Sequence, residues 1–126
     1  MAELTGPWLG SYWQANTPTR FEATFVQANN SLSGRIVDDS SLGEAQIQGE
    51  VIGRQVSFTK RYFNNSSYTI QYTGTLSEDG NHITGQWRFD KQHNGPWEAH
   101  RSDNDLSKEL QTIIRKKLPT LASSKG

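Results

Sequence analysis

Residues 51–76, VIGRQVSFTKRYFNNSSYTIQYTGTL, decide the fold because they predict two antiparallel strands joined by a polar loop. Every second side chain points to one side of the two strands, and this inward face consists of Val56, Phe58, Lys60, Tyr62, Tyr68, Ile70, Tyr72, Gly74 and Leu76. The face is apolar except for one lysine and three tyrosines. This is unusual for an otherwise apolar face, because buried ammonium and phenol groups need hydrogen-bonding partners.

The same alternation continues on both sides of this hairpin. Including the central pair, strands are predicted at residues 8–14, 20–27, 31–38, 44–52, 55–62, 68–76, 81–90 and 96–101. Consecutive short strands with short connections are typical of an all-β, eight-stranded antiparallel up-and-down barrel. Closure removes the exposed edges that an open sheet would have. A sandwich of two sheets is the structural alternative.

The lengths of the connections predict that the two ends of the barrel differ. The connections at 14–19, 39–43, 63–67 and 91–95 are expected to be long, and those at 28–30, 53–54 and 77–80 tight. Alternate connections of a meander lie at the same end, so one end is predicted to be an open mouth and the other a closed base. Inward residues expected near the mouth are Tyr12, Phe21, Asp38, Ala45, Tyr62, Tyr68, Phe89 and Trp97.

The barrel is predicted to occupy residues 1–103, and a C-terminal helix to follow at residues 104–119. Asn104 or Asp105 can cap this helix, and Pro119 ends it. We expect the helix to pack on the outside of the barrel. Residues 120–126 are expected to form a disordered tail.

Composition restricts the possible partners and location. The chain has 126 residues, enough for one domain, and its 13 basic and 13 acidic side chains are scattered and give no net charge. We therefore expect neither a nucleic acid nor a membrane as partner. The sequence has no cysteine and shows no signal peptide or apolar stretch long enough to span a bilayer. These features predict a cytoplasmic protein.

The sequence offers little support for catalysis or metal binding. His82, His93 and His100 have no metal-ligand spacing and are expected to be exposed. The sequence shows no Ser-His-acid arrangement, phosphate-binding loop or acidic metal cluster. We therefore expect no metal or cofactor and assign no catalytic residue, and the sequence favours a binding protein over an enzyme.

Short motifs between the first and the last predicted strand resemble those of the calycin superfamily, which contains lipocalins, fatty-acid-binding proteins and avidins. The first strand carries Gly6-Pro7-Trp8 and the last ends at Arg101; T-G-x-W at 5–8, L-S-G at 32–34, T-G-Q at 84–86 and W-x-x-x-R-S at 97–102 are most similar to avidins. The resemblance implies a ligand-binding mouth, and a base closed by Trp8 with Arg101 packed over it. Gly10 stands where avidins have a polar residue for biotin, so biotin is not carried over.

The candidate ligand-binding residues are the aromatic and polar side chains expected near the mouth. They are Tyr12, Phe21, Asp38, Lys60, Tyr62, Tyr68, Tyr72, Trp87, Phe89 and Trp97. Gly10, Ala23, Gly34 and Gly49 are expected at one level, opposite Phe58, Tyr72 and Trp87. Either the aromatic rings fill the barrel, or the small residues leave a pocket. Likewise, Lys60 and Asp38 either form a self-sufficient ion pair, or Lys60 holds an acceptor group of a ligand.

Three functions follow from these alternatives. The first is a small-molecule-binding barrel whose partly apolar ligand has a polar acceptor group. The second is an enzyme that uses the lysine, aspartate and tyrosines of the mouth on an apolar substrate. The third is a filled barrel that acts as an assembly or interaction module. Val37, Ile52 and Trp13 are predicted to point outward, and we expect a homodimer or homotetramer through the barrel wall.

Overall fold

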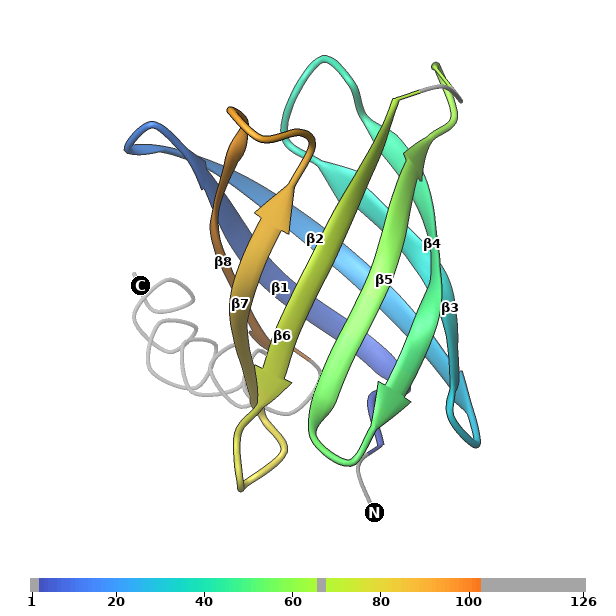
Figure 1. Ribbon diagram of the computed structural model, residues 1–126. Helices are drawn as coiled ribbons and strands as arrows, with labels where there is room; N and C mark the ends of the chain where they lie inside the picture. The colour runs from blue at the N-terminus through green and yellow to red at the C-terminus, as the bar shows by residue number, and fades with distance from the viewer. Residues whose placement is uncertain (1–2, 66–67, 103–126) are drawn as a thin grey trace, which may run out of the picture.

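The computed structural model describes residues 3–65 and 68–102, which form a closed barrel of eight antiparallel strands in sequence order (Figure 1). The strands are β1 (Gly6–Gln14), β2 (Thr17–Ala28), β3 (Ser31–Asp38), β4 (Glu44–Ile52), β5 (Gln55–Tyr62), β6 (Thr69–Leu76), β7 (His82–Arg88) and β8 (Asn94–Arg101). The predicted up-and-down barrel is therefore confirmed, and the two-sheet sandwich is wrong. The predicted helix at 104–119 and tail at 120–126 lie outside the described residues.

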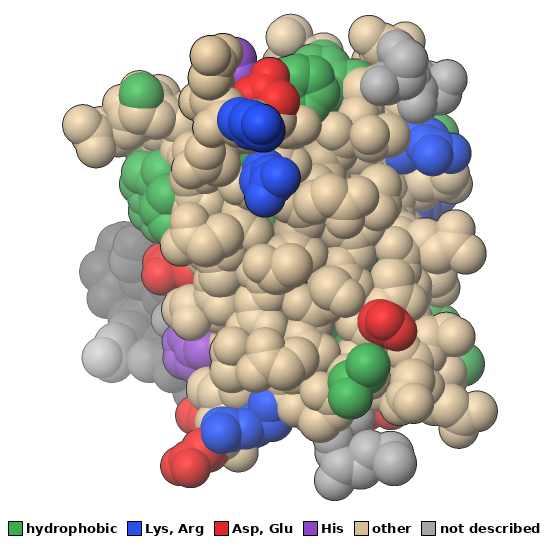
Figure 2. Space-filling view, viewed as in Figure 1, with side chains coloured by type: hydrophobic (Ala, Val, Ile, Leu, Met, Phe, Trp, Pro, Cys, Tyr) green, Lys and Arg blue, Asp and Glu red, His purple; other side chains and the backbone are tan. Residues whose placement is uncertain are grey.

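Alternation along each strand separates the core from the wall. In β5, Val56, Phe58, Lys60 and Tyr62 are buried, whereas Gln55 is exposed. The outer face over β5, β6 and β7 is mostly uncharged and polar, with scattered charged side chains (Figure 2). A single closed sheet thus explains the low apolar content, because only one side of each strand needs apolar residues. In the described part of the chain, no helix has the length and apolar character needed to cross a bilayer.

The first connection is shorter than predicted. Instead of a loop at 14–19, β1 and β2 are joined by Ala15 and Asn16, whose φ angles are 46° and 75°. Positive φ at both central residues defines the tight turn that best matches the twist of a hairpin. The turn places Gly10 opposite Phe21, so the prediction that Gly10 lies level with Ala23 is wrong.

The residues predicted near the mouth lie at different heights, and one strand ends earlier than predicted. Ala45 pairs with Ile36, and the Asp38 N–H donates to the Gly43 carbonyl at 2.9 Å, so Asp38 lies nearer the mouth than Ala45. Strand β7 ends at Arg88 rather than at residue 90, which leaves Phe89 outside the strand and 44% exposed. The predicted level of Phe58, Tyr72 and Trp87 is confirmed, because these residues pair across β5, β6 and β7.

A buried tryptophan and an arginine close the base of the barrel. Trp8 is fully buried, pairs with Arg101, and has the Arg101 guanidinium carbon 4.8 Å from its ring centroid. Arg101 also donates from Nε to the Gly80 carbonyl at 3.0 Å. The contact implied by the resemblance to calycins is thus present. Leu4, which the sequence analysis did not single out, is fully buried and accepts a 2.9 Å hydrogen bond from the Trp8 indole N–H.

Aromatic rings fill the space that the strand glycines leave. A Cβ atom on Gly10 would lie 2.5 Å from Cζ of Phe21, and one on Gly74 would lie 3.0 Å from Cζ2 of Trp97. The Trp97 indole passes across Gly74 and donates to the Thr73 carbonyl at 2.9 Å. Large rings packed against small residues therefore fill these parts of the barrel, and a pocket remains at the mouth.

Candidate functional site

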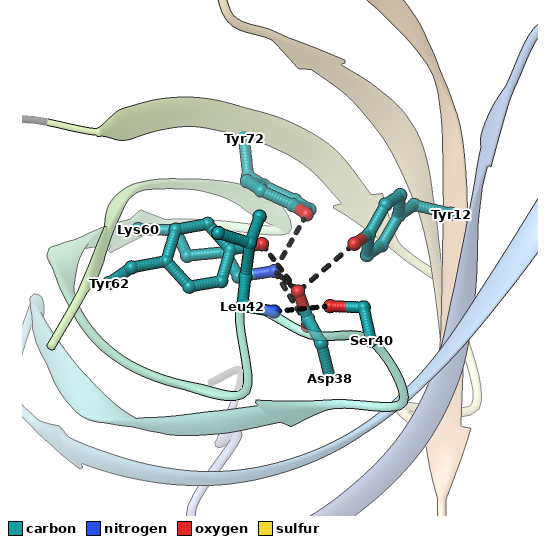
Figure 3. Close-up of polar contacts among 7 residues, drawn as sticks. All are labelled: Tyr12, Asp38, Ser40, Leu42, Lys60, Tyr62 and Tyr72. Carbon is teal, nitrogen blue, oxygen red and sulfur yellow. Dashed lines mark hydrogen bonds and ion pairs between the residues drawn. The ribbon is translucent and has the colours of Figure 1, made fainter. Parts of the chain in front are cut away.

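A buried ion pair forms the centre of the site. Asp38 is the last residue of β3 and Lys60 lies near the end of β5, so both strands deliver their side chains to the interior near the mouth (Figure 3). The Lys60 ammonium lies 2.8 Å from Oδ1 and 2.9 Å from Oδ2 of Asp38. Both side chains have no solvent exposure. Their mutual contact provides the partner that each buried charge requires.

Three tyrosines surround this ion pair. The Tyr12 hydroxyl donates to Oδ2 of Asp38 at 3.0 Å, and the Tyr62 hydroxyl donates to the same oxygen. The Tyr72 hydroxyl accepts a long hydrogen bond of 3.4 Å from the Lys60 ammonium. The ammonium also lies 4.8 Å from the ring centroids of both Tyr12 and Tyr62. The aspartate is therefore saturated with donors, and the lysine is enclosed by aromatic faces.

Burial and the Asp38 charge keep the phenols protonated. Burial, reinforced by the negative charge of Asp38, raises the pKa of Tyr12 to about 12. Burial, again followed by the effect of Asp38, raises the pKa of Tyr62 and of Tyr72 far above the usual value. Burial lowers the pKa of Lys60, and the Asp38 charge opposes this shift. The phenols are accordingly hydrogen-bond donors at neutral pH rather than acids.

A pocket of about 110 Å³ lies at the mouth beside this cluster. Its lining residues are Tyr12, Gln14, Leu42, Tyr62, Tyr68, Ile70, Tyr72, Trp87, Phe89 and His93. Among the predicted ligand-binding residues, those on the lining are Tyr12, Tyr62, Tyr68, Tyr72, Trp87 and Phe89. Asp38 and Lys60 belong to the cluster but not to the lining, and Phe21 and Trp97 are buried in the core.

The pocket wall depends on a glycine of β8. The Trp87 indole N–H donates to the Trp13 carbonyl at 3.0 Å. A Cβ atom on Gly95 would lie 2.4 Å from the Trp13 oxygen and 2.9 Å from the Trp87 nitrogen. Gly95 therefore leaves room for the Trp87 indole to pass over β8 and reach β1. This contact fixes the Trp87 ring on one side of the pocket.

Sequence reasoning missed the lining residues contributed by the rim. Leu42 lies in the loop between β3 and β4 and packs against the core, and its carbonyl accepts a 3.3 Å hydrogen bond from Asn64. His93 precedes β8, and its Nδ1 lies 2.8 Å from the Asp90 carboxylate. The leucine was a detectable signal, since it is the one apolar side chain among DSSLG at residues 39–43.

Outside the pocket, the wall carries isolated apolar side chains. Val37 and Ile52 are 50% and 60% exposed, as predicted from their parity, whereas Trp13 is partly buried. Val37 lies near the mouth end of β3 and Ile52 at the base end of β4. Within residues 3–65 and 68–102, no group of three or more His, Cys, Asp or Glu residues is placed to hold a metal ion.

Comparisons with known proteins agree with the fold. No protein-family model matches the sequence, and no curated protein sequence is significantly similar to it. Among solved structures, the chain is similar to a de novo designed fluorescence-activating β-barrel, with a TM-score of 0.56 and 12% sequence identity. The match covers 78% of this chain and 93% of the designed chain. The likeness is one of architecture, an eight-stranded antiparallel barrel.

Proposed function

We propose that this barrel binds a small, partly apolar molecule in the mouth pocket, with a polar acceptor group of the ligand directed at the tyrosine cluster. The observation that carries the proposal is the pocket itself, which combines aromatic walls with a convergent set of polar side chains at one end of an otherwise filled barrel. Apolar walls with a few placed polar groups are the usual form of a small-molecule site.

The size of the pocket limits the ligand. Pockets for drug-sized molecules measure roughly 300–1,000 Å³, whereas an engineered apolar cavity of about 150 Å³ binds benzene. A pocket of about 110 Å³ that opens at the rim suits a molecule of one ring with a small substituent. The stacking surfaces offered by Tyr68, Trp87 and Phe89 favour an aromatic or flat ring.

Two likenesses support a ligand-binding use of the interior. The packing of Arg101 over Trp8 agrees with the resemblance to calycin barrels, and we propose a calycin-type relationship on this basis. The designed barrel of similar fold is described as fluorescence-activating. Both likenesses concern the architecture, and the pocket residues carry the rest of the proposal.

The filled-barrel function is the alternative that a specific observation favours. Rings cover Gly10 and Gly74, and the Lys60–Asp38 pair is already complete without a ligand. An assembly module would need only a stable barrel whose outer wall contacts a partner. An enzyme has weaker support, because the lysine and aspartate that would act on a substrate do not line the pocket.

A fluorescence titration with single-ring molecules separates these functions. Trp87 lines the pocket, so its emission should change when a ring binds. Tyr68→Ala, which removes a wall of the pocket, should weaken binding about tenfold. Phe63→Ala is the matched control, because Phe63 is 51% exposed and contacts Arg35 on the outside of the barrel. Unchanged emission with every probe would favour the filled barrel.

A further inference from the structure

The Tyr72 hydroxyl is a buried donor that has no acceptor among the described residues. Tyr72 is 1% exposed and lines the pocket, and its oxygen accepts the long hydrogen bond from Lys60. Within residues 3–65 and 68–102, no group accepts a hydrogen bond from this hydroxyl. Leaving a buried donor without a partner destabilises the folded protein, so such groups call for an explanation.

The neighbouring buried donors are all engaged. Tyr12 and Tyr62 donate to Asp38, and Lys60 donates to both oxygens of the same carboxylate. The Trp87 indole N–H donates to the Trp13 carbonyl. Figure 3 shows the Tyr72 hydroxyl directed toward the centre of this cluster, across from that of Tyr12. Among the described residues, Tyr72 therefore supplies a free donor at the buried side of the pocket.

We propose that Tyr72 determines ligand specificity by donating its hydroxyl proton to a neutral carbonyl-type acceptor on a single-ring ligand. The inference rests on the proposed function and names its ligand class. Lys60 acts through Tyr72: its N–H group donates to the tyrosine oxygen, and a hydroxyl that accepts such a bond becomes a stronger donor. Lys60 can thus assist ligand binding without lining the pocket.

The charges of the cluster favour a neutral ligand. The Lys60 charge is balanced by Asp38 at 2.8 Å, so the site has no net positive charge to attract a carboxylate. A cationic ligand would meet rings whose faces already contact the Lys60 ammonium at 4.8 Å. Burial also raises the pKa of Tyr72, which keeps the proton available for donation.

The test compares three probes of similar shape: acetophenone has a carbonyl group, ethylbenzene lacks it, and benzoate carries a negative charge. Binding to the full chain is measured by calorimetry and by tryptophan fluorescence. Acetophenone should bind about tenfold more tightly than ethylbenzene, and benzoate should bind more weakly than acetophenone. Tyr72→Phe should remove the preference for acetophenone, while Phe63→Ala, at an exposed ring outside the pocket, should keep it.

The outcomes distinguish the inference from the proposed function. If ethylbenzene and acetophenone bind equally well, or if Tyr72→Phe keeps the preference, the pocket stands and the role of Tyr72 is wrong. Tightest binding of benzoate also overturns it. If no probe binds, the proposed function fails as well. Should Tyr72→Phe not fold, the infrared carbonyl band of acetophenone bound to the unaltered protein decides: a phenol donor lowers its frequency, and an unshifted band contradicts the inference.

Discussion

The two ends of the barrel place a cation against aromatic rings in different ways. At the base, Arg101 lies 4.8 Å from the Trp8 ring and donates to backbone carbonyls such as that of Gly80. At the mouth, Lys60 lies at the same distance from two tyrosine rings but donates to the Asp38 carboxylate. Carbonyls do not titrate and Arg stays charged, so the contact between Arg101, the Trp8 ring and the Gly80 carbonyl contains no group that titrates near neutral pH. At the mouth, by contrast, the lysine, the aspartate and the tyrosines are all ionisable, and the pKa of each phenol and of the lysine depends on its neighbours.

The largest effect is expected from removing the base closure. Trp8→Ala should lower the free energy of unfolding by about 3–5 kcal/mol, because it empties the space of a fully buried indole. Chemical denaturation measures the change. Phe89→Ala at the mouth is the matched control, since that ring is 44% exposed and should cost less than about 1 kcal/mol.

Arg101→Ala should act through the same contact and also destabilise the protein. Thermal melts of the Trp8 and Arg101 variants that coincide with the unaltered protein would show that the base is not closed by this pair.

The second effect comes from breaking the ion pair at the mouth. Asp38→Asn should lower the free energy of unfolding by about 3 kcal/mol, because it leaves the buried Lys60 ammonium without a negative partner. Denaturation of this variant is compared with the double variant Asp38→Asn/Lys60→Met, which removes both charges. The double variant should be more stable than Asp38→Asn. A double variant no more stable than Asp38→Asn would mean that the unpaired Lys60 ammonium is not the cause of the loss.

The next effect is a loss of stability in alkaline solution. Between pH 10, where an unperturbed tyrosine ionises, and pH 12, the unfolded chain loses phenolic protons that Tyr12 retains in the folded barrel. The folded state then binds more protons, so the free energy of unfolding falls as the pH rises. Tyr62 and Tyr72 act in the same direction, and Lys60 acts in the opposite one.

Urea denaturation at a series of pH values measures this dependence. Because the three tyrosines outnumber the one lysine, we expect a net fall in stability above pH 10, and Tyr62→Phe should make the fall shallower. A free energy of unfolding that stays constant or rises through this range would show that burial does not raise the pKa values of these phenols.

The smallest expected effect concerns self-association. We propose that the exposed apolar side chains of the wall, with Val37 and Ile52 as the candidates, contact a second copy of the chain. Ile52→Ser should then lower the dimer fraction in sedimentation experiments without changing the fold. Phe63→Ser is the control for Ile52, because Phe63 is exposed at the mouth end of the barrel and Ile52 lies at the base end. A monomer at high concentration would exclude this assembly.

The sequence predicted which residues face inward better than it predicted their levels. Alternation alone placed Lys60, Tyr62 and Tyr72 inside, and the structure buries all three. The predicted level of Gly10 was wrong because it depends on the position of the turn between β1 and β2. The turn lies at residues 15–16, and Ala15 gave no signal for it, because alanine is uncommon at positive φ. The error is an even number of residues, so it moved side chains along the axis without reversing their faces.

The contents of the barrel could not be predicted from the strands alone. Whether a glycine faces a pocket or a ring depends on the direction in which a neighbouring aromatic side chain leans, as Phe21 does over Gly10. Leu4 was missed for a related reason, because a single apolar residue before the first strand has no periodicity. The rim residue Leu42 lies in a loop, where strand alternation says nothing about orientation.

The two indole groups that cross glycines have a consequence for how the ring of strands is held closed. Trp97 joins β8 to β6, 24 residues apart in sequence, and Trp87 joins β7 to β1, 74 residues apart. Each bond passes over an intervening strand, so it couples strands that share no ladder. Sliding β8 by two residues, for example, would break its backbone hydrogen bonds to β7 and also the Trp97 bond to β6. The Trp87 bond spans the seam where β1 and β8, the first and last strands, meet, so the stagger of that seam is fixed by a side chain as well as by the backbone.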